Sequence, residues 1–69
     1  MTVEEFRERV LAAKPEDLPT LKAEAGELAA SLEDSGEHVP DWVYLLDMVD
    51  PTAVDMLEWA KEDIREESL

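Results

Sequence analysis

Apolar residues are concentrated in one short segment in the second half of the chain. Seven of the eight residues in Trp42–Val49 are apolar or aromatic, and Asp47 is the only charged residue among them. Pro40 suits the first turn of a helix, and Pro51 disfavours helical geometry in the residue before it. A helix that is apolar on nearly all sides is normally buried on nearly all sides. The pattern therefore predicts a central, buried helix at about residues 40–49.

The first half of the chain carries the three- and four-residue apolar spacing of two amphipathic helices. Thr2 and Glu5 form a capping-box pattern at the start of the first helix, which ends before Pro15. The second helix is predicted over residues 18–34, with Asp17 as its cap. These two helices are expected to pack against the central one.

Gly26, Gly36 and Pro51 provide the remaining signals for where the helices pack, end and begin. Gly26 costs about 1 kcal/mol in the middle of a helix, so it indicates close approach of another helix or a tolerated surface position. Gly36 ends the second helix. The last helix is predicted from about 51 to 66, with Asp50 as its cap and a frayed end over 66–69. The predicted fold is all-α: a compact bundle of three to four helices around residues 40–49, as a single acidic helical domain spanning 1–69.

Charge is the strongest signal in the composition. Nineteen acidic and six basic residues give a net charge of −13. Such a charge opposes direct binding to nucleic acid or an anionic membrane and favours basic partners. The alternative explanation is an acidic proteome, such as that of a halophile. The acidic N-terminus does not resemble a signal peptide and no apolar run reaches membrane-spanning length, so a cytoplasmic protein is predicted.

Few residues offer catalytic or metal chemistry. The chain has no cysteine, and its one histidine, His38, lies in a loop without companions at ligand spacing. No calcium-loop or phosphate-loop pattern occurs. We therefore expect neither an enzyme nor a metal or other cofactor, and interpret His38 as structural or incidental.

The last predicted helix carries the candidate site. At 100° per residue, its inward apolar stripe faces away from a row of four acids: Asp55, Glu58, Glu62 and Glu66. Trp59 lies beside that row, with Met56 and Asp63 on its other flank. An indole on an acidic face is typical of an interaction anchor. The alternatives are an ordinary solvated row and, for Met56 and Trp59, a place in the core. The predicted partner-binding residues are Asp55, Met56, Glu58, Trp59, Glu62, Asp63 and Glu66.

These features favour a non-enzymatic protein that binds a basic, nucleic-acid-binding partner as a nucleic-acid mimic. In size and charge the chain is similar to small acidic inhibitors that block nucleic-acid-binding sites, including phage-borne inhibitors of CRISPR and restriction systems. That similarity does not extend to a residue motif, and no family is assigned. The alternative is a helical regulatory or assembly module, antitoxin-like or a small subunit, that binds through apolar patches. The sequence leaves a homodimer open.

Overall fold

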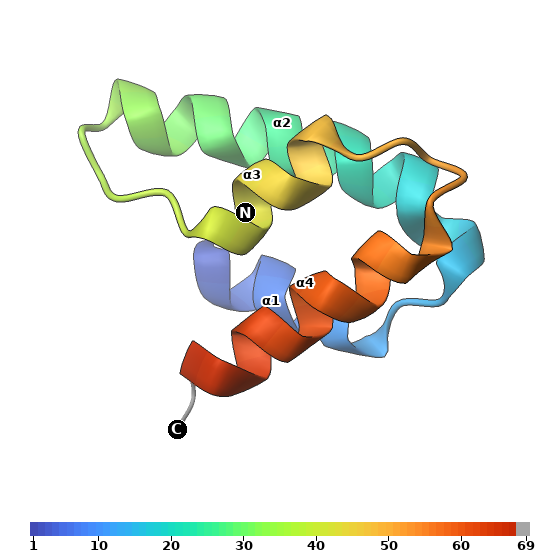
Figure 1. Cartoon of the computed structure of the whole chain (residues 1–69). Coiled ribbons are helices and arrows are strands. Elements are labelled where there is room, and N and C mark those ends of the chain that lie inside the picture. Colours follow the sequence, from blue (N-terminus) through green and yellow to red (C-terminus); the bar gives the residue numbers. More distant parts are fainter. Residues whose placement is uncertain (68–69) are drawn as a thin grey trace.

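A computed structural model describes residues 1–67 and confirms the all-α bundle (Figure 1). Among these residues there are four α-helices, one short 3-10 helix and no strand. α2 and α3 pack against each other, and α4 packs against both α3 and α1. The elements are α1 (Val3–Ala12), the 3-10 helix η1 (Pro15–Asp17), α2 (Leu18–Asp34), α3 (Asp41–Met48) and α4 (Val54–Glu67).

The predicted start of α1 and end of α2 are confirmed by their hydrogen bonds. Thr2 Oγ1 accepts from the Glu5 N–H at 3.1 Å, which satisfies one free donor of the first turn. Gly36 has a φ of 73°, a conformation that glycine adopts without strain. The Gly36 N–H donates to Glu33 O at 3.1 Å and the Glu37 N–H donates to Leu32 O at 2.8 Å. This is the Schellman arrangement, which satisfies the last carbonyls of a helix.

Two predicted caps are wrong. The Asp17 carboxylate accepts from the Lys14 N–H at 3.0 Å, so it closes the 3-10 turn before α2 and makes no cap bond to α2. Asp50 Oδ1 accepts from the N–H and the hydroxyl of Thr52, at 2.9 and 2.8 Å. These bonds form a local turn, a known competitor of helix initiation for aspartate. α4 consequently begins at Val54, three residues later than predicted at Pro51.

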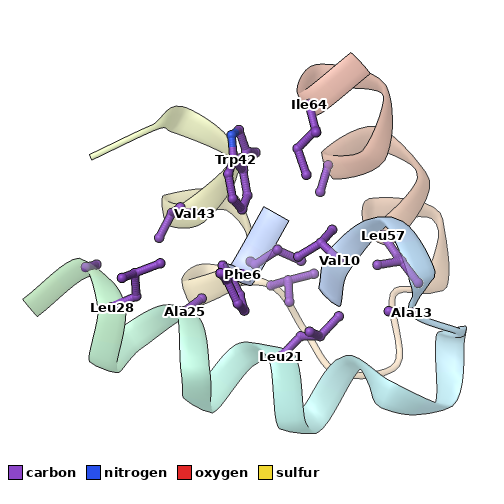
Figure 2. Packing of buried hydrophobic residues seen from close by; sticks show 14 of the residues in the cluster. Phe6, Val10, Ala13, Leu21, Ala25, Leu28, Trp42, Val43, Leu57 and Ile64 are labelled. Carbon is purple, nitrogen blue, oxygen red and sulfur yellow. The ribbon is translucent and has the colours of Figure 1, made fainter. Parts of the chain in front are cut away.

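The core is apolar and includes residues from all four helices. Phe6 and Trp42 stack with ring centroids 5.7 Å apart and an interplanar angle of 20°. Figure 2 shows Phe6 between α2 and the Trp42 indole, with Val10 and Leu57 to its right. The largest fully buried side chains are Phe6, Val10, Leu18, Trp42, Val43, Leu46, Leu57 and Ile64.

The central segment is less enclosed than its composition predicted. Trp42, Val43 and Leu46 are buried, but Leu45 is only half-buried and Met48 is 75% exposed. A chain of this length buries only about 60% of its unfolded surface, so it cannot surround one helix on every side. α3 is a core helix with one uncovered apolar edge.

Gly26 of α2 faces α3, and the group of α3 that comes close to it is the side chain of Asp47. A Cβ at Gly26 would lie 2.8 Å from Asp47 Oδ1, and no other described residue outside α2 comes within 4 Å. Lys22 Nζ donates to the Asp47 carbonyl at 2.6 Å one turn earlier on α2. The expected close approach is therefore present, with a carboxylate and not a backbone as the neighbouring group.

Candidate functional site

α4 separates apolar and acidic residues on opposite faces. Leu57, Ala60 and Ile64 are buried against the rest of the bundle. The four acids of the predicted row are all exposed: Asp55, Glu58, Glu62 and Glu66. At 1.5 Å per residue, this row extends about 16 Å along the helix.

Trp59 lies on the acidic side of α4 and is 62% exposed. The alternative that Trp59 belongs to the core is therefore wrong. Met56 differs, because it is partly buried and packs against the core cluster. Asp63, one turn after Trp59, is half-buried.

Trp59 borders an open hollow of about 290 Å³, which we call the α3–α4 hollow. From α4 it is lined by Trp59, Glu62, Asp63 and Glu66, at positions i, i+3, i+4 and i+7 of one helical stripe. From α3 it is lined by Leu45. Asp55 and Glu58 do not line the hollow, although both are exposed. Of the seven predicted residues, four therefore line the hollow, while Asp55, Met56 and Glu58 lie outside it.

Leu45 and Glu67 are the residues that the sequence analysis missed. The central helix was expected to bury Leu45, and Glu67 was placed in a frayed end. Instead, Trp42 Nε1–H donates to Glu67 Oε2 at 3.1 Å, and Arg7 lies 3.8 Å from the same oxygen. Ser68 and Leu69, also assigned to the frayed end, lie outside the described residues. The Trp42–Glu67 bond fixes the end of α4 beside the start of α3, and so sets the position of Leu45 relative to the carboxylates.

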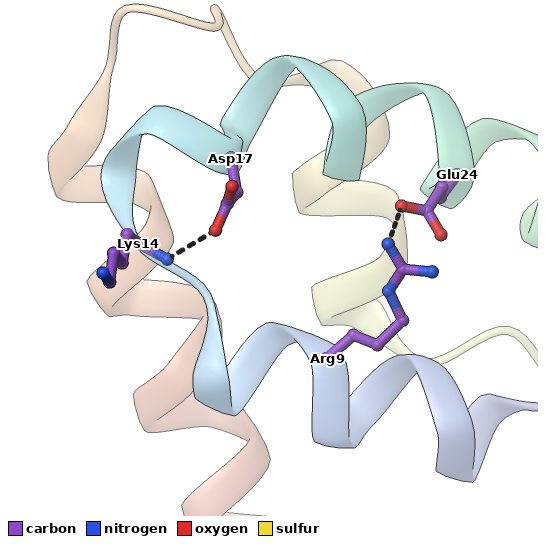
Figure 3. A network of polar contacts seen from close by, with 4 residues as sticks. All are labelled: Arg9, Lys14, Asp17 and Glu24. Carbon is purple, nitrogen blue, oxygen red and sulfur yellow. Dashed lines mark hydrogen bonds and ion pairs between the residues drawn. The ribbon is translucent and has the colours of Figure 1, made fainter.

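The basic side chains with described partners are engaged away from the hollow. Arg9 of α1 pairs with Glu24 of α2 at 2.6 Å, as Figure 3 shows, and Arg7 pairs with Glu67. Lys22 Nζ donates to the Asp47 carbonyl, and Lys61 Nζ donates to the Ala13 carbonyl at 2.7 Å. Within residues 1–67, no ion pair involves the three carboxylates around the hollow.

Two groups outside the hollow titrate away from their ordinary range. Tyr44 Oη donates to Glu33 Oε1 at 2.6 Å, and this hydrogen bond to an anion raises the pKa of Tyr44. The Thr52 backbone N–H, helped by the Thr52 hydroxyl, lowers the pKa of Asp50 by stabilising its charged form. The first contact joins α3 to α2, and the second closes the turn before α4.

Residues 1–67 contain no group of three or more acidic or histidine side chains arranged to hold a metal ion. His38 is exposed in the loop between α2 and α3. None of the described helices combines the length and the apolar character that crossing a membrane requires.

Comparison with protein-family models, curated proteins and solved structures finds no match to this chain.

Proposed function

We propose that this chain is a non-enzymatic interaction protein that binds a basic surface of a partner protein through the outer face of α4. The observation that supports this most directly is the exposed Trp59 among carboxylates that have no ion pair within the described residues. Exposed aromatic residues supply most of the binding energy at many interfaces, and charges of one sign select partners of the other.

The specific form we propose is competition with nucleic acid, as in the anti-CRISPR and anti-restriction class of inhibitors. The exposed acids of α4 present one charge per about 5 Å along the helix axis, compared with one phosphate per about 3.4 Å along a DNA strand. This density is sufficient to engage several basic residues of a groove that otherwise binds phosphates. A net charge of −13 would add long-range attraction and raise the association rate.

One observation favours a second candidate, an interaction module that binds mainly through apolar contacts. Leu45 borders the hollow, and Met48, one turn further along α3, is 75% exposed. A regulatory or assembly partner would bury this α3 edge together with Trp59. Charge would then steer the encounter and contribute little to residence time.

The first experiment is capture of partners from a lysate of the source cells, at low and at physiological salt. Basic nucleic-acid-binding proteins that are displaced by added DNA would support the proposed competition. Capture of proteins that DNA does not displace would favour the second candidate. Absence of any basic partner at either salt concentration would contradict the proposed function.

Binding kinetics of the captured partner then test the role of α4. Glu58→Lys with Glu62→Lys should slow association and weaken its salt dependence. The matched control is Glu4→Lys with Glu8→Lys, which changes the net charge equally on two exposed positions of α1. Trp59→Ala should speed dissociation by about thirtyfold, because truncating an interface anchor typically costs about 2 kcal/mol or more. If both lysine pairs act equally, net charge and not α4 determines binding.

A further inference from the structure

The α3–α4 hollow combines an exposed indole, an aliphatic side chain and three carboxylates in one open depression. Trp59 and Leu45 come from different helices, and the three acids follow Trp59 along α4. The hollow is about 290 Å³ in volume, at the lower limit of the range for drug-sized ligands. Its size therefore suits one side chain of a partner better than a separate small molecule.

The chemistry of the lining selects a cation with a flat, weakly hydrated surface. A guanidinium group stacks on an indole face and donates to carboxylates through a planar fork. A lysine ammonium is a compact and strongly hydrated point charge, so it gains less from the same indole. Glu62, Asp63 and Glu66 offer acceptors within about two turns of Trp59.

No described basic residue of α4 is placed to fill the hollow. Lys61 is directed to the Ala13 carbonyl, on the side of α4 that faces the bundle. Arg65 lies about 120° around the helix from Trp59. The Trp42–Glu67 hydrogen bond joins α3 to α4 in the absence of a partner. This contact reduces the conformational entropy that the two helices lose when a partner binds.

We infer that the α3–α4 hollow binds an arginine side chain of the basic partner, with the guanidinium stacked on Trp59 and paired with the carboxylates of Glu62, Asp63 and Glu66. This inference rests on the proposed function and specifies how the basic surface is recognised. Charge complementarity identifies the occupant as cationic, and the exposed indole identifies it as arginine in preference to lysine.

The test is titration with hexaarginine and hexalysine peptides at about 0.15 M salt, where the Debye length is about 8 Å. The readout is the NMR signal of each indole Nε1–H. Trp59→Leu assigns the two signals, and the buried, hydrogen-bonded Trp42 serves as an internal reference. We expect a saturable shift of the Trp59 signal and tighter binding of hexaarginine by about twofold to fivefold, the range of a cation–π contact at an exposed site.

Three variants separate the hollow from general acidity. Trp59→Leu keeps an apolar side chain but removes the aromatic face, so it should reduce the preference for arginine and retain weak binding of both peptides through the carboxylates. Glu62→Gln with Glu66→Gln should weaken hexaarginine binding more than Glu4→Gln with Glu8→Gln, an exposed pair with the same spacing on α1. Thermal melting of each variant verifies that the fold is intact.

The outcomes distinguish this inference from the proposed function. Equal binding of the two peptides, or hexaarginine binding without a shift of the Trp59 signal, would overturn the arginine site while leaving a binder of basic surfaces. An arginine preference that is undiminished in Trp59→Leu would overturn it as well. Failure of both peptides to bind would contradict the arginine site and the proposed function together.

Discussion

Trp42 Nε1–H donates to Glu67 Oε2 at 3.1 Å, joining the first turn of α3 to the last turn of α4. The Trp42 side chain is 0% exposed in the folded protein, and Glu67 is the described acceptor for its N–H. A buried donor without a partner costs about 1–3 kcal/mol. This bond is therefore a polar contact that holds the end of α4 against the start of α3, the two helices that line the hollow.

Glu67→Ala should lower the free energy of unfolding by about 1–2 kcal/mol, because it leaves the Trp42 N–H without its acceptor. The ion pair with Arg7 adds little, since its atoms are 3.8 Å apart and both side chains are partly exposed. Urea unfolding measures the change, with Glu66→Ala as control. Glu66 is the preceding residue and faces solvent, so its loss should change stability by less than about 0.5 kcal/mol. Equal effects of the two variants would show that Trp42 does not depend on Glu67.

Replacing each glycine by alanine should have opposite effects. Gly26→Ala should stabilise the protein by about 0.5–1 kcal/mol, because the gain in helix propensity exceeds the cost of rotating the Asp47 carboxylate away from the new Cβ. Gly36→Ala should destabilise it by about 1 kcal/mol, because alanine is strained at a φ of 73°. Thermal melting of both variants provides the comparison.

Asp47→Ala provides the control for Gly26. In that background the Cβ at position 26 meets no carboxylate, so Gly26→Ala should give the full gain of about 1 kcal/mol. A loss of stability on Gly26→Ala in both backgrounds would mean that α2 and α3 approach through their backbones.

Asp50 should make a contribution to stability that is lost in acid. Its pKa is lowered in the folded protein, chiefly by the Thr52 backbone N–H. A carboxylate with a depressed folded pKa stabilises the protein above its unfolded pKa of about 3.9, and this contribution disappears as the pH falls through the folded value. The stability difference between the wild type and Asp50→Asn should therefore be constant above about pH 5 and shrink below about pH 4. A difference independent of pH would contradict a role for the charge.

Salt should stabilise the fold. Only two ion pairs, Arg7–Glu67 and Arg9–Glu24, join side chains in the described part of the chain, while the net charge is −13. Self-repulsion of this charge is screened as the Debye length falls from about 30 Å at 0.01 M to about 8 Å at 0.15 M. The melting temperature should rise by several degrees over this range. The rise should be smaller for Glu4→Lys with Glu8→Lys, and a flat curve would show that repulsion does not limit stability.

The local signals in the sequence were sufficient for the presence of the four helices and for the acidic face of α4. Apolar spacing predicted the bounds of α2, and Thr2 and Gly36 predicted a cap and a stop that the structure confirms. The position of Asp55, Glu58, Glu62 and Glu66 on one face, opposite the apolar stripe, followed from 100° per residue, and all four are exposed. These properties depend on residues within one or two turns of each other, so the sequence contains them directly.

Contacts between helices decided the rest. Whether Trp59 is exposed depends on which neighbours cover α4, and helical periodicity does not specify neighbours. The same reason explains why the roles of Leu45 and Glu67 were missed: Leu45 borders the hollow, and Glu67 accepts from an indole 25 positions away. Asp50 shows that a local signal can also be ambiguous. A helix cap and a local turn both use an aspartate carboxylate that accepts from a nearby backbone N–H, and the sequence does not distinguish them. Sequence thus determined the surface of α4, and tertiary packing decided which part of that surface forms a hollow.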